Sequence, residues 1–278
     1  MPKVTRPDAS LHVDVLGTGS PVLLVQGVGV EGRGYAPQLA DLSRIHTCVT
    51  FDHRGIGASR ADPRTVTVPA MADDVLAIAD ELGFGRFHLV GHSLGGVVAQ
   101  CVALRAPSRV RSLVLQCTFA GGRDLRVPSA RLAWLGLRSK VGTAAMRRTA
   151  FARLVYPDAY LERVGLERAI ATLTAAFGRD LAEAPAIADV QLAALRAHDE
   201  RDRLGELAAI PCLVQAGAHD PIARPEFARE LARRIGGATL EIDPDASHAL
   251  PIQCADAVNA RWLAHFADAE AREVGTPA

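Results

Sequence analysis

Five short, almost continuously apolar segments constrain the fold of this chain more than any other feature of its sequence. They are PVLLVQ (21–26), HTCVTFD (46–52), FHLVGHS (87–93), VRSLVLQ (110–116) and PCLVQAG (211–217). Such segments are typical of strands whose two faces are both covered by helices. Helical patterns follow three of them, at 71–83, 94–106 and 225–237. The alternation predicts an α/β fold with a mostly parallel sheet and helices on both faces.

Two weaker strand patterns and a polar terminus complete the expected core. LHVDVL (11–16) alternates with a period of two and predicts an edge strand, and ATLEI (238–242) predicts the last strand. From about Glu270 onward the composition indicates a loose polar tail.

The stretch 120–208 interrupts this alternation and shows only helical patterns. We expect helices at 129–139 and 143–154, and two more before Leu207. The sequence therefore predicts one domain with a helical cap at 120–208. The α/β core is then made of the two flanking parts, residues 1–119 and 209–278.

The composition argues against several classes of partner. The chain has 31 basic and 31 acidic residues, and a net charge of zero gives no support to nucleic-acid binding. No apolar segment approaches the ~18 residues of a membrane helix, and the N-terminus has no apolar signal segment. We therefore expect a cytoplasmic protein without membrane contact. The cysteines form no C-x-x-C pair, which predicts free thiols and no bound metal; they are Cys48, Cys101, Cys117, Cys212 and Cys254.

The segment LVGHSLGG (89–96) joins a predicted buried strand to a predicted helix. At its centre Ser93 is flanked by Gly91 and Gly95. A residue on so sharp a turn takes a strained backbone conformation, so the positions two before and two after it need to be small. The following helix points its N-terminal N–H groups at negative charge that develops beside the serine. This combination predicts a nucleophile elbow with Ser93 as the nucleophile.

A serine hydroxyl needs a base, and the base needs a carboxylate that orients it. In hydrolases with a nucleophile elbow the serine, the acid and the histidine follow in that order along the chain. Asp220 lies directly after the segment 211–217, and His248 lies in the loop after the last predicted strand. Both are at carboxyl ends of strands, where open α/β sheets bind ligands. Asp243 and Asp245 flank the histidine loop and are alternative orienting acids.

From about residue 10 to 268 the chain resembles the α/β-hydrolase superfamily, with 120–208 as the variable cap. The resemblance rests on GHSLGG (91–96), DHRGIGAS (52–59), GAHDPIARPE (217–226) and SHALPIQCADAVNARWLAHF (247–266). The core is most similar to small esterases and enol-lactonases. The resemblance implies the α/β-hydrolase fold, with Ser93, Asp220 and His248 as the catalytic triad and without a metal or an organic cofactor.

The glycine-rich segment VLLVQGVGVEG (22–32) allows two interpretations. A strand followed by G-x-G-x-x-G from Gly27, with Asp52 farther along, matches a dinucleotide-binding turn. Pro37 would then fall about two turns into the next helix, where it removes a backbone hydrogen bond. Pro37 is better placed early in a later helix, and this favours the hydrolase interpretation.

In the hydrolase interpretation the same loop forms half of an oxyanion hole. The resemblance implies that Val28 and Leu94 each offer a backbone N–H, while Gly27 and Gly29 let the backbone approach the substrate oxygen. The family usually has His-Gly where this chain has Gln26-Gly27. A glutamine amide can also form local hydrogen bonds, so we expect activity to survive.

Residues 121–153 contain eight basic side chains and one acidic side chain, hence a net charge of +7. The basic ones are Arg123, Arg126, Arg131, Arg138, Lys140, Arg147, Arg148 and Arg153. They suit a solvated helix face, a clamp for the carboxylate of an anionic substrate, or a patch that docks on an acidic carrier protein or a membrane surface. His92 in the elbow and Trp134 in the cap are further candidates for lining the pocket.

These features predict a serine hydrolase that cleaves a small-molecule carboxylic ester or lactone through an acyl-enzyme. C–C bond hydrolysis and perhydrolysis use the same triad, and some relatives keep the triad while acting as small-molecule receptors. These functions are alternatives at this point.

Overall fold

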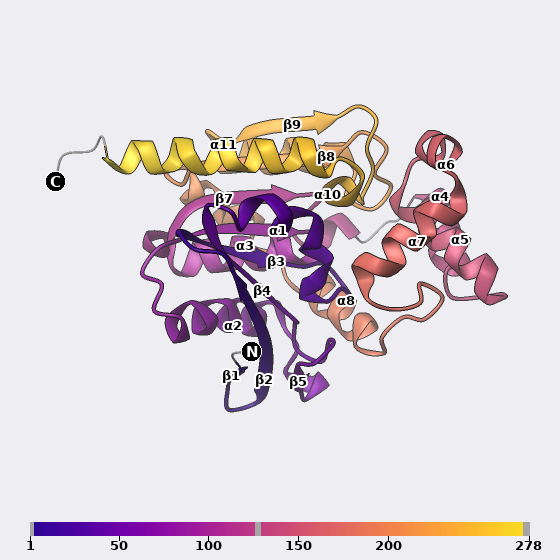
Figure 1. Cartoon of the computed structure of the whole chain (residues 1–278), viewed down its shortest axis with the longest axis horizontal. Coiled ribbons are helices and arrows are strands. Elements are labelled where there is room, and N and C mark those ends of the chain that lie inside the picture. Colours follow the sequence, from indigo (N-terminus) through magenta and orange to yellow (C-terminus); the bar gives the residue numbers. More distant parts are fainter. Residues whose placement is uncertain (1–2, 126–128, 275–278) are drawn as a thin grey trace.

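One mixed sheet organises the structure, a computed structural model that describes residues 3–125 and 129–274 (Figure 1). Its strands are β1 (Lys3–Thr5), β2 (Ala9–Leu16), β3 (Ser20–Val25), β4 (His46–Phe51), β5 (Arg60–Ala61), β6 (Phe87–His92), β7 (Val110–Gln116), β8 (Cys212–Gly217) and β9 (Thr239–Asp243). They lie in the order β1-β2-β4-β3-β6-β7-β8-β9, with β5 beside β2. From β4 to β9 in this order neighbours are parallel, whereas β1, β2 and β5 pair in an antiparallel way. The predicted mostly parallel sheet is confirmed.

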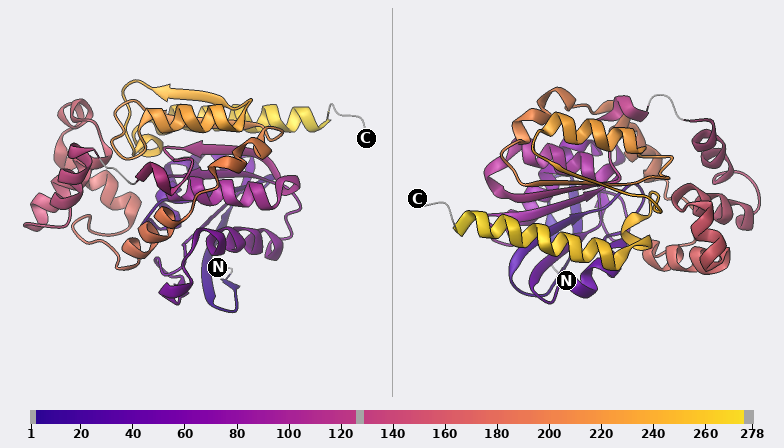
Figure 2. Two further views of the ribbon diagram at one scale, coloured as in Figure 1. Left: turned by 180° about the vertical axis from the view of Figure 1, so that it is seen from behind. Right: turned by 90° about the horizontal axis from the view of Figure 1, so that it is seen from above.

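Helices cover both faces of this sheet. The core helices are α1 (Ala36–Leu42), α2 (Val68–Glu81), α3 (Leu94–Arg105), α9 (Pro225–Ile235), α10 (Leu250–Gln253) and α11 (Ala255–Val274). On one face α11 packs against α1 (Figures 1 and 2). On the other face α3 packs against α2 and against the turn η5 (Arg201–Leu207), which also contacts α9. The central strand β3 is fully buried from Val22 to Val25, as its apolar composition requires.

Two details of the predicted core are wrong. Strand β2 is not an edge strand, because β1 pairs with it on the side that faces away from β4. A strand of three residues is too short to show a pattern in the sequence. The helix expected from residue 71 begins at Val68, because the Thr67 hydroxyl caps it by accepting the Ala70 N–H at 3.1 Å.

The prediction of a loose polar tail from about Glu270 is also wrong for residues 270–274, because α11 continues to Val274. The carboxylate of Glu270 lies 3.2 Å from a ring nitrogen of His88, and Glu273 accepts a hydrogen bond from Arg111 at 3.1 Å. These partners are far away in the sequence, so the local composition of the terminus could not reveal them. The remainder of the predicted tail, residues 275–278, lies outside the described residues.

The stretch 120–208, which we call the cap segment, is helical where the structure describes it. It contains α4 (Ala130–Arg138), α5 (Ala144–Val155), α6 (Asp158–Val164), α7 (Leu166–Phe177) and α8 (Ile187–Ala197). Three helices instead of the expected two follow α5, because Gly165, at φ +86°, separates α6 from α7. Helices α4 to α7 lie beyond one end of the sheet (Figure 1).

Candidate active site

Ser93 lies on the tight turn between β6 and α3 and has an unusual backbone conformation, with φ +54° and ψ −119°. A non-glycine residue in this region carries strain that its surroundings must maintain. A Cβ atom at Gly91 would overlap the carbonyl of Gly95, and one at Gly95 would overlap the carbonyl of Val25. Both glycines are therefore required by close backbone approach, as the motif predicts.

Hydrogen bonds from β7 and the residues after it hold this turn in place. The Ser93 N–H donates to the Gln116 carbonyl at 3.0 Å, and the Thr118 hydroxyl donates to the Ser93 carbonyl at 2.6 Å. Thr118 also fills the space beside Gly96, where a Cβ would meet its side chain. Sequence reasoning missed Thr118, because a threonine after a strand carries no signal of such a role.

His248 and Asp220 form a buried hydrogen-bonded pair. The distance from His248 Nδ1 to Asp220 Oδ2 is 2.7 Å. The other oxygen of Asp220 accepts the N–H groups of Ile222 and Ala223 at 2.7 and 2.9 Å. A carboxylate only accepts, so this pair places the proton on Nδ1 and leaves Nε2 of His248 as the basic nitrogen.

The other acids near His248 do not take this position. Asp245 is exposed, and its N–H donates to the side chain of Asp243 at 2.9 Å. His219, next to Asp220 in the sequence, is exposed as well. Of the three candidate acids, Asp220 is the partner of the His248 ring.

Ser93 and His248 line one cavity of about 230 Å³, so the structure brings the predicted nucleophile and the predicted base together. The hydrogen bonds of the described residues do not include one between their side chains, which is common in the absence of substrate. The cavity wall also contains the following residues: Gly27, Val28, Val30, His92, Phe119, Leu125, Phe151, Leu154, Val155, Phe177, Leu192, Leu195 and Ile222.

The loop after β3 closes on Ser93 from the other side. A Cβ at Gly27 would lie 3.1 Å from the Ser93 Cβ, so only a residue without a side chain fits comfortably there. Gly29, at φ +70°, donates its N–H to Gln191 Oε1 of α8 at 2.9 Å. Among the described residues, the Val28 N–H donates to no loop or turn acceptor, and Leu94 begins α3, where an N–H has no partner within the helix. Both N–H groups are therefore available to a ligand beside Ser93.

Gln191 is a second residue that sequence reasoning missed. Its side chain is buried and connects α8 of the cap segment to the loop that contains Val28. No motif marks it, because its role depends on where α8 packs.

The same loop lacks the geometry of a dinucleotide-binding turn. After Gly27 the chain forms a short 3₁₀ turn, η1 (Gly32–Tyr35), and α1 begins only at Ala36, with Pro37 in its first turn. Asp52 cannot serve a ribose, because its two oxygens accept the N–H groups of Gly32 and Ala58, each at 2.9 Å. The placement of Pro37 at the start of a later helix is confirmed.

Gln26, which stands where the family usually has histidine, is accommodated locally. It is buried, and its carbonyl oxygen lies 3.0 Å from His53 Nε2. Its side-chain oxygen accepts the Gly27 N–H at 3.4 Å. Gly34 provides the room, because a Cβ there would lie 2.7 Å from the Gln26 amide nitrogen.

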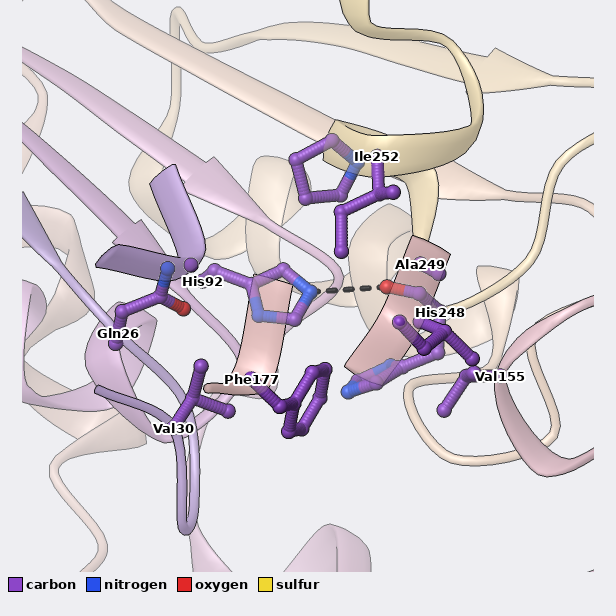
Figure 3. A pocket seen from close by; sticks show the side chains of 11 residues that line it. Gln26, Val30, His92, Val155, Phe177, His248, Ala249 and Ile252 are labelled. Carbon is purple, nitrogen blue, oxygen red and sulfur yellow. Dashed lines mark hydrogen bonds between the residues drawn. The ribbon is translucent and has the colours of Figure 1, made fainter. Parts of the chain in front are cut away.

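A second chamber, of about 40 Å³, adjoins the site (Figure 3). Figure 3 shows His92 between Gln26 and His248, with its ring directed at the His248 carbonyl, to which Nε2 donates at 2.9 Å. Burial, together with the nearby His248, lowers the pKa of His92 to about 3. His92 therefore stays neutral at ordinary pH, lines the pocket and anchors the loop that carries His248.

Trp134 does not line this cavity, and that expectation is corrected. Its side chain is 61% exposed. It borders a separate surface hollow together with Arg138, whose guanidinium lies 5.9 Å from the Trp134 ring centroid. Leu135 takes the buried position on α4 instead, and a short amphipathic pattern could not show which of the two faces inward.

The basic side chains of 121–153 lie elsewhere too. In the described part of the chain none of them lines the cavity around Ser93, and Arg126 lies outside the described residues. Arg131 pairs with Asp158 at 3.2 Å and Lys140 pairs with Asp189 at 2.7 Å. The hypothesis of an arginine clamp for an anionic substrate therefore has no support from this geometry.

Two groups of side chains within the described residues place possible metal ligands within 4.8 Å of one another. They are His92 with Cys117 and His248, and Cys101 with His198 and Glu200. Metal ligation by cysteine needs the thiolate. Burial raises the pKa of Cys101 to about 12 and that of Cys117 well above its ordinary value. We assign no metal to either group.

In the part of the chain that the structure describes, no helix has the length and apolar character needed to cross a membrane.

Comparison with known proteins places the chain in a family. It matches the alpha/beta hydrolase fold over residues 20–253. It is 31% identical over 254 residues to "Putative carbamate hydrolase RutD" of Rhizobium rhizogenes. The alignment covers 87% of this chain and 92% of that protein. The protein of the same name from Variovorax paradoxus is 34% identical over 277 residues, covering 96% and 99%.

Among solved structures, the enol-lactonase from Burkholderia xenovorans LB400 superposes with a TM-score of 0.77 and 26% identity, over 96% of this chain and 100% of that one. The fold, the elbow and these comparisons agree. The chain belongs to the alpha/beta hydrolase fold family.

Proposed function

We propose that this hydrolase cleaves a carboxylic ester or a lactone, with Ser93 as nucleophile, His248 as base and Asp220 as orienting acid. The observation that carries the proposal is the apolar cavity that Ser93 and His248 share. Among the described residues, its lining contains no Asp, Glu, Lys or Arg side chain. A carbonyl compound with apolar substituents fits such walls, whereas an ionised group would lose its hydration there without gaining a partner.

In this mechanism Ser93 Oγ attacks the carbonyl carbon while His248 Nε2 takes its proton. The carbonyl oxygen becomes an oxyanion, which accepts hydrogen bonds from the N–H groups of Val28 and Leu94. The C–O bond to the leaving group then breaks, and His248 donates the proton to the departing alkoxide. Water attacks the acyl-enzyme with His248 again as base, and Ser93 recovers its proton as the acid product leaves.

Carbamate hydrolysis is a second candidate function, since the two relatives described above carry that name at 31% and 34% identity. A free carbamate is small and anionic, and among the described residues the cavity lining contains no Lys or Arg side chain to pair with its charge. We therefore favour the ester or lactone.

The test is a panel of p-nitrophenyl acetate, p-nitrophenyl butyrate, a γ-lactone and ammonium carbamate, assayed with the native chain and with Ser93→Ala. We expect multiple turnovers of the esters, reduced by roughly 1000-fold or more in Ser93→Ala. Ser112→Ala is the matched control, because Ser112 is also buried but bonds His88 on the far part of β6.

Faster release of ammonia from carbamate than of nitrophenol from the esters would favour the second candidate. A single slow turnover of every compound would favour a small-molecule receptor. Ester hydrolysis that survives Ser93→Ala would exclude the proposed nucleophile.

A further inference from the structure

The cavity around Ser93 adjoins a larger groove on the cap segment and shares part of its wall with it. The groove has a volume of about 680 Å³. Four side chains belong to the walls of both spaces: Leu125, Leu154, Leu192 and Ile222. All four are apolar, so a ligand that extends from one space to the other would cross no polar side chain of these shared walls.

One face of α4 forms much of the groove. Leu132, Ala133, Gly136 and Leu137 line it at the spacing of successive helical turns, and Lys140 follows one turn later. Arg196 of α8 lies on the other wall. The side chain of Lys140 is 57% exposed and pairs with Asp189, and Arg196 is exposed, so the charged groups lie at the solvent side.

The groove leaves apolar surface in contact with water. Leu137 on its wall is 55% exposed. Covering apolar surface of this kind with an apolar ligand lowers the free energy of the system, because both surfaces leave water. A short ester would fill the cavity of about 230 Å³ and leave the groove uncovered.

We propose that the substrate of this site is an ester or lactone with a long unbranched apolar chain. The chain starts at the carbonyl beside Ser93, passes the four shared side chains and lies in the groove between α4 and α8. This inference rests on the proposed function and adds the substrate class, a medium- or long-chain acyl or alkyl compound.

Gly136 allows a direct test of the groove. A Cβ at this position would meet no atom within 4 Å, so a side chain built there enters open space instead of the packed core. Since Gly136 is inside a helix, its replacement also removes a residue that weakens helices. Gly136→Trp should therefore fold and obstruct the groove. The matched control is Gly85→Trp. Gly85 also has no atom within 4 Å of its Cβ position, but it is an exposed residue of the loop between α2 and β6 and does not line the groove.

The experiment measures kcat/KM for p-nitrophenyl esters from acetate to dodecanoate, each below its critical micelle concentration. A second series, alkyl acetates of the same lengths, shows whether the chain belongs to the acyl or the alcohol side. In the native chain we expect kcat/KM to rise with chain length in one of the two series. The rise should be up to about fourfold for each methylene group that is buried, and roughly 100-fold or more between the shortest and the longest chain. Gly136→Trp should lose at least tenfold on decanoate and less than twofold on acetate. Gly136→Ala should lie between, and Gly85→Trp should behave like the native chain.

A flat or falling profile in both series would overturn the inference. Equal losses on acetate and decanoate in Gly136→Trp, or the same loss in Gly85→Trp, would also overturn it. Either result with Ser93-dependent acetate hydrolysis intact leaves the proposed function standing. If the native chain shows no Ser93-dependent turnover of any ester in either series, the proposed function itself is wrong.

Discussion

At the scale of single residues, Asp220 is held more completely than any other member of the site. It is 3% exposed, and its two oxygens accept three hydrogen bonds, from His248 and from two backbone N–H groups of its own loop. The backbone bonds fix the carboxylate, and the carboxylate fixes the imidazole ring and its tautomer. The role we propose for Asp220 is therefore to orient His248 and to stabilise its protonated form.

Replacing Asp220 by Asn should lower kcat by roughly 10⁴-fold with little change in folding. The amide oxygen can still accept the two backbone N–H groups, but an amide cannot hold the required tautomer and charge of His248. Steady-state kinetics with p-nitrophenyl butyrate, together with a thermal melt, measure both effects. Asp245→Asn serves as the control, because Asp245 is exposed and uses its backbone for its hydrogen bonds with Asp243 and Gln253. Equal losses in the two variants would contradict the assignment.

At the scale of elements, the site depends on the junction of β6 with α3. The turn is tight enough that the backbones of Val25 and Gly95 touch, and β7 supplies the hydrogen bonds that hold Ser93 in its strained conformation. Glycine at position 95 therefore serves the packing of two strands and a helix.

Gly95→Ala should destabilise the fold by about 1–3 kcal/mol, because the added methyl group would overlap the rigid Val25 carbonyl. Urea denaturation measures the loss, and ester turnover should fall with it. In Gly85→Ala the added methyl group meets nothing within 4 Å, so its stability should stay within ~0.5 kcal/mol of the native chain. A Gly95→Ala variant as stable as Gly85→Ala would show that the turn relaxes freely.

The elements also show what a sequence can and cannot predict. The meeting of Ser93, Asp220 and His248 at one edge of the sheet was predictable, because each follows a strand and the carboxyl ends of parallel strands lie together. Thr118 and Gln191 were not predictable, because their partners are the elbow and the β3 loop, which are far away in the sequence. Trp134 was misplaced for a related reason. The orientation of a cap helix depends on the core that it covers, and its own nine residues do not contain that information.

At the scale of the whole molecule, histidines whose pKa burial lowers link stability to pH. Burial lowers the pKa of His53, His88 and His265 to about 4 and that of His92 to about 3, and it also lowers the pKa of His46. In the unfolded chain each would titrate near its ordinary value of ~6.5. Between about pH 6.5 and pH 4 the unfolded chain therefore binds more protons than the folded chain.

The free energy of unfolding should consequently fall as the pH is lowered from about 6.5 to about 4, and these histidines should add no pH dependence above about pH 7. Each one contributes at most about 1.4 kcal/mol per pH unit. Urea denaturation at half-unit steps measures the profile, and His265→Gln should reduce its slope in this window. A free energy that stays constant from pH 7 to pH 4.5 would contradict the buried, neutral state of these rings.

The central claim, that Ser93 is the nucleophile of this hydrolase, is tested most directly by trapping it with a fluorophosphonate, which reacts with activated serines. Mass spectrometry of the tryptic peptide FHLVGHSLGGVVAQCVALR, residues 87–105, locates the adduct. We expect one adduct per chain, on Ser93, formed in step with the loss of ester turnover and absent from Ser93→Ala. A chain that hydrolyses esters but is modified at another residue, or not at all, would contradict this claim.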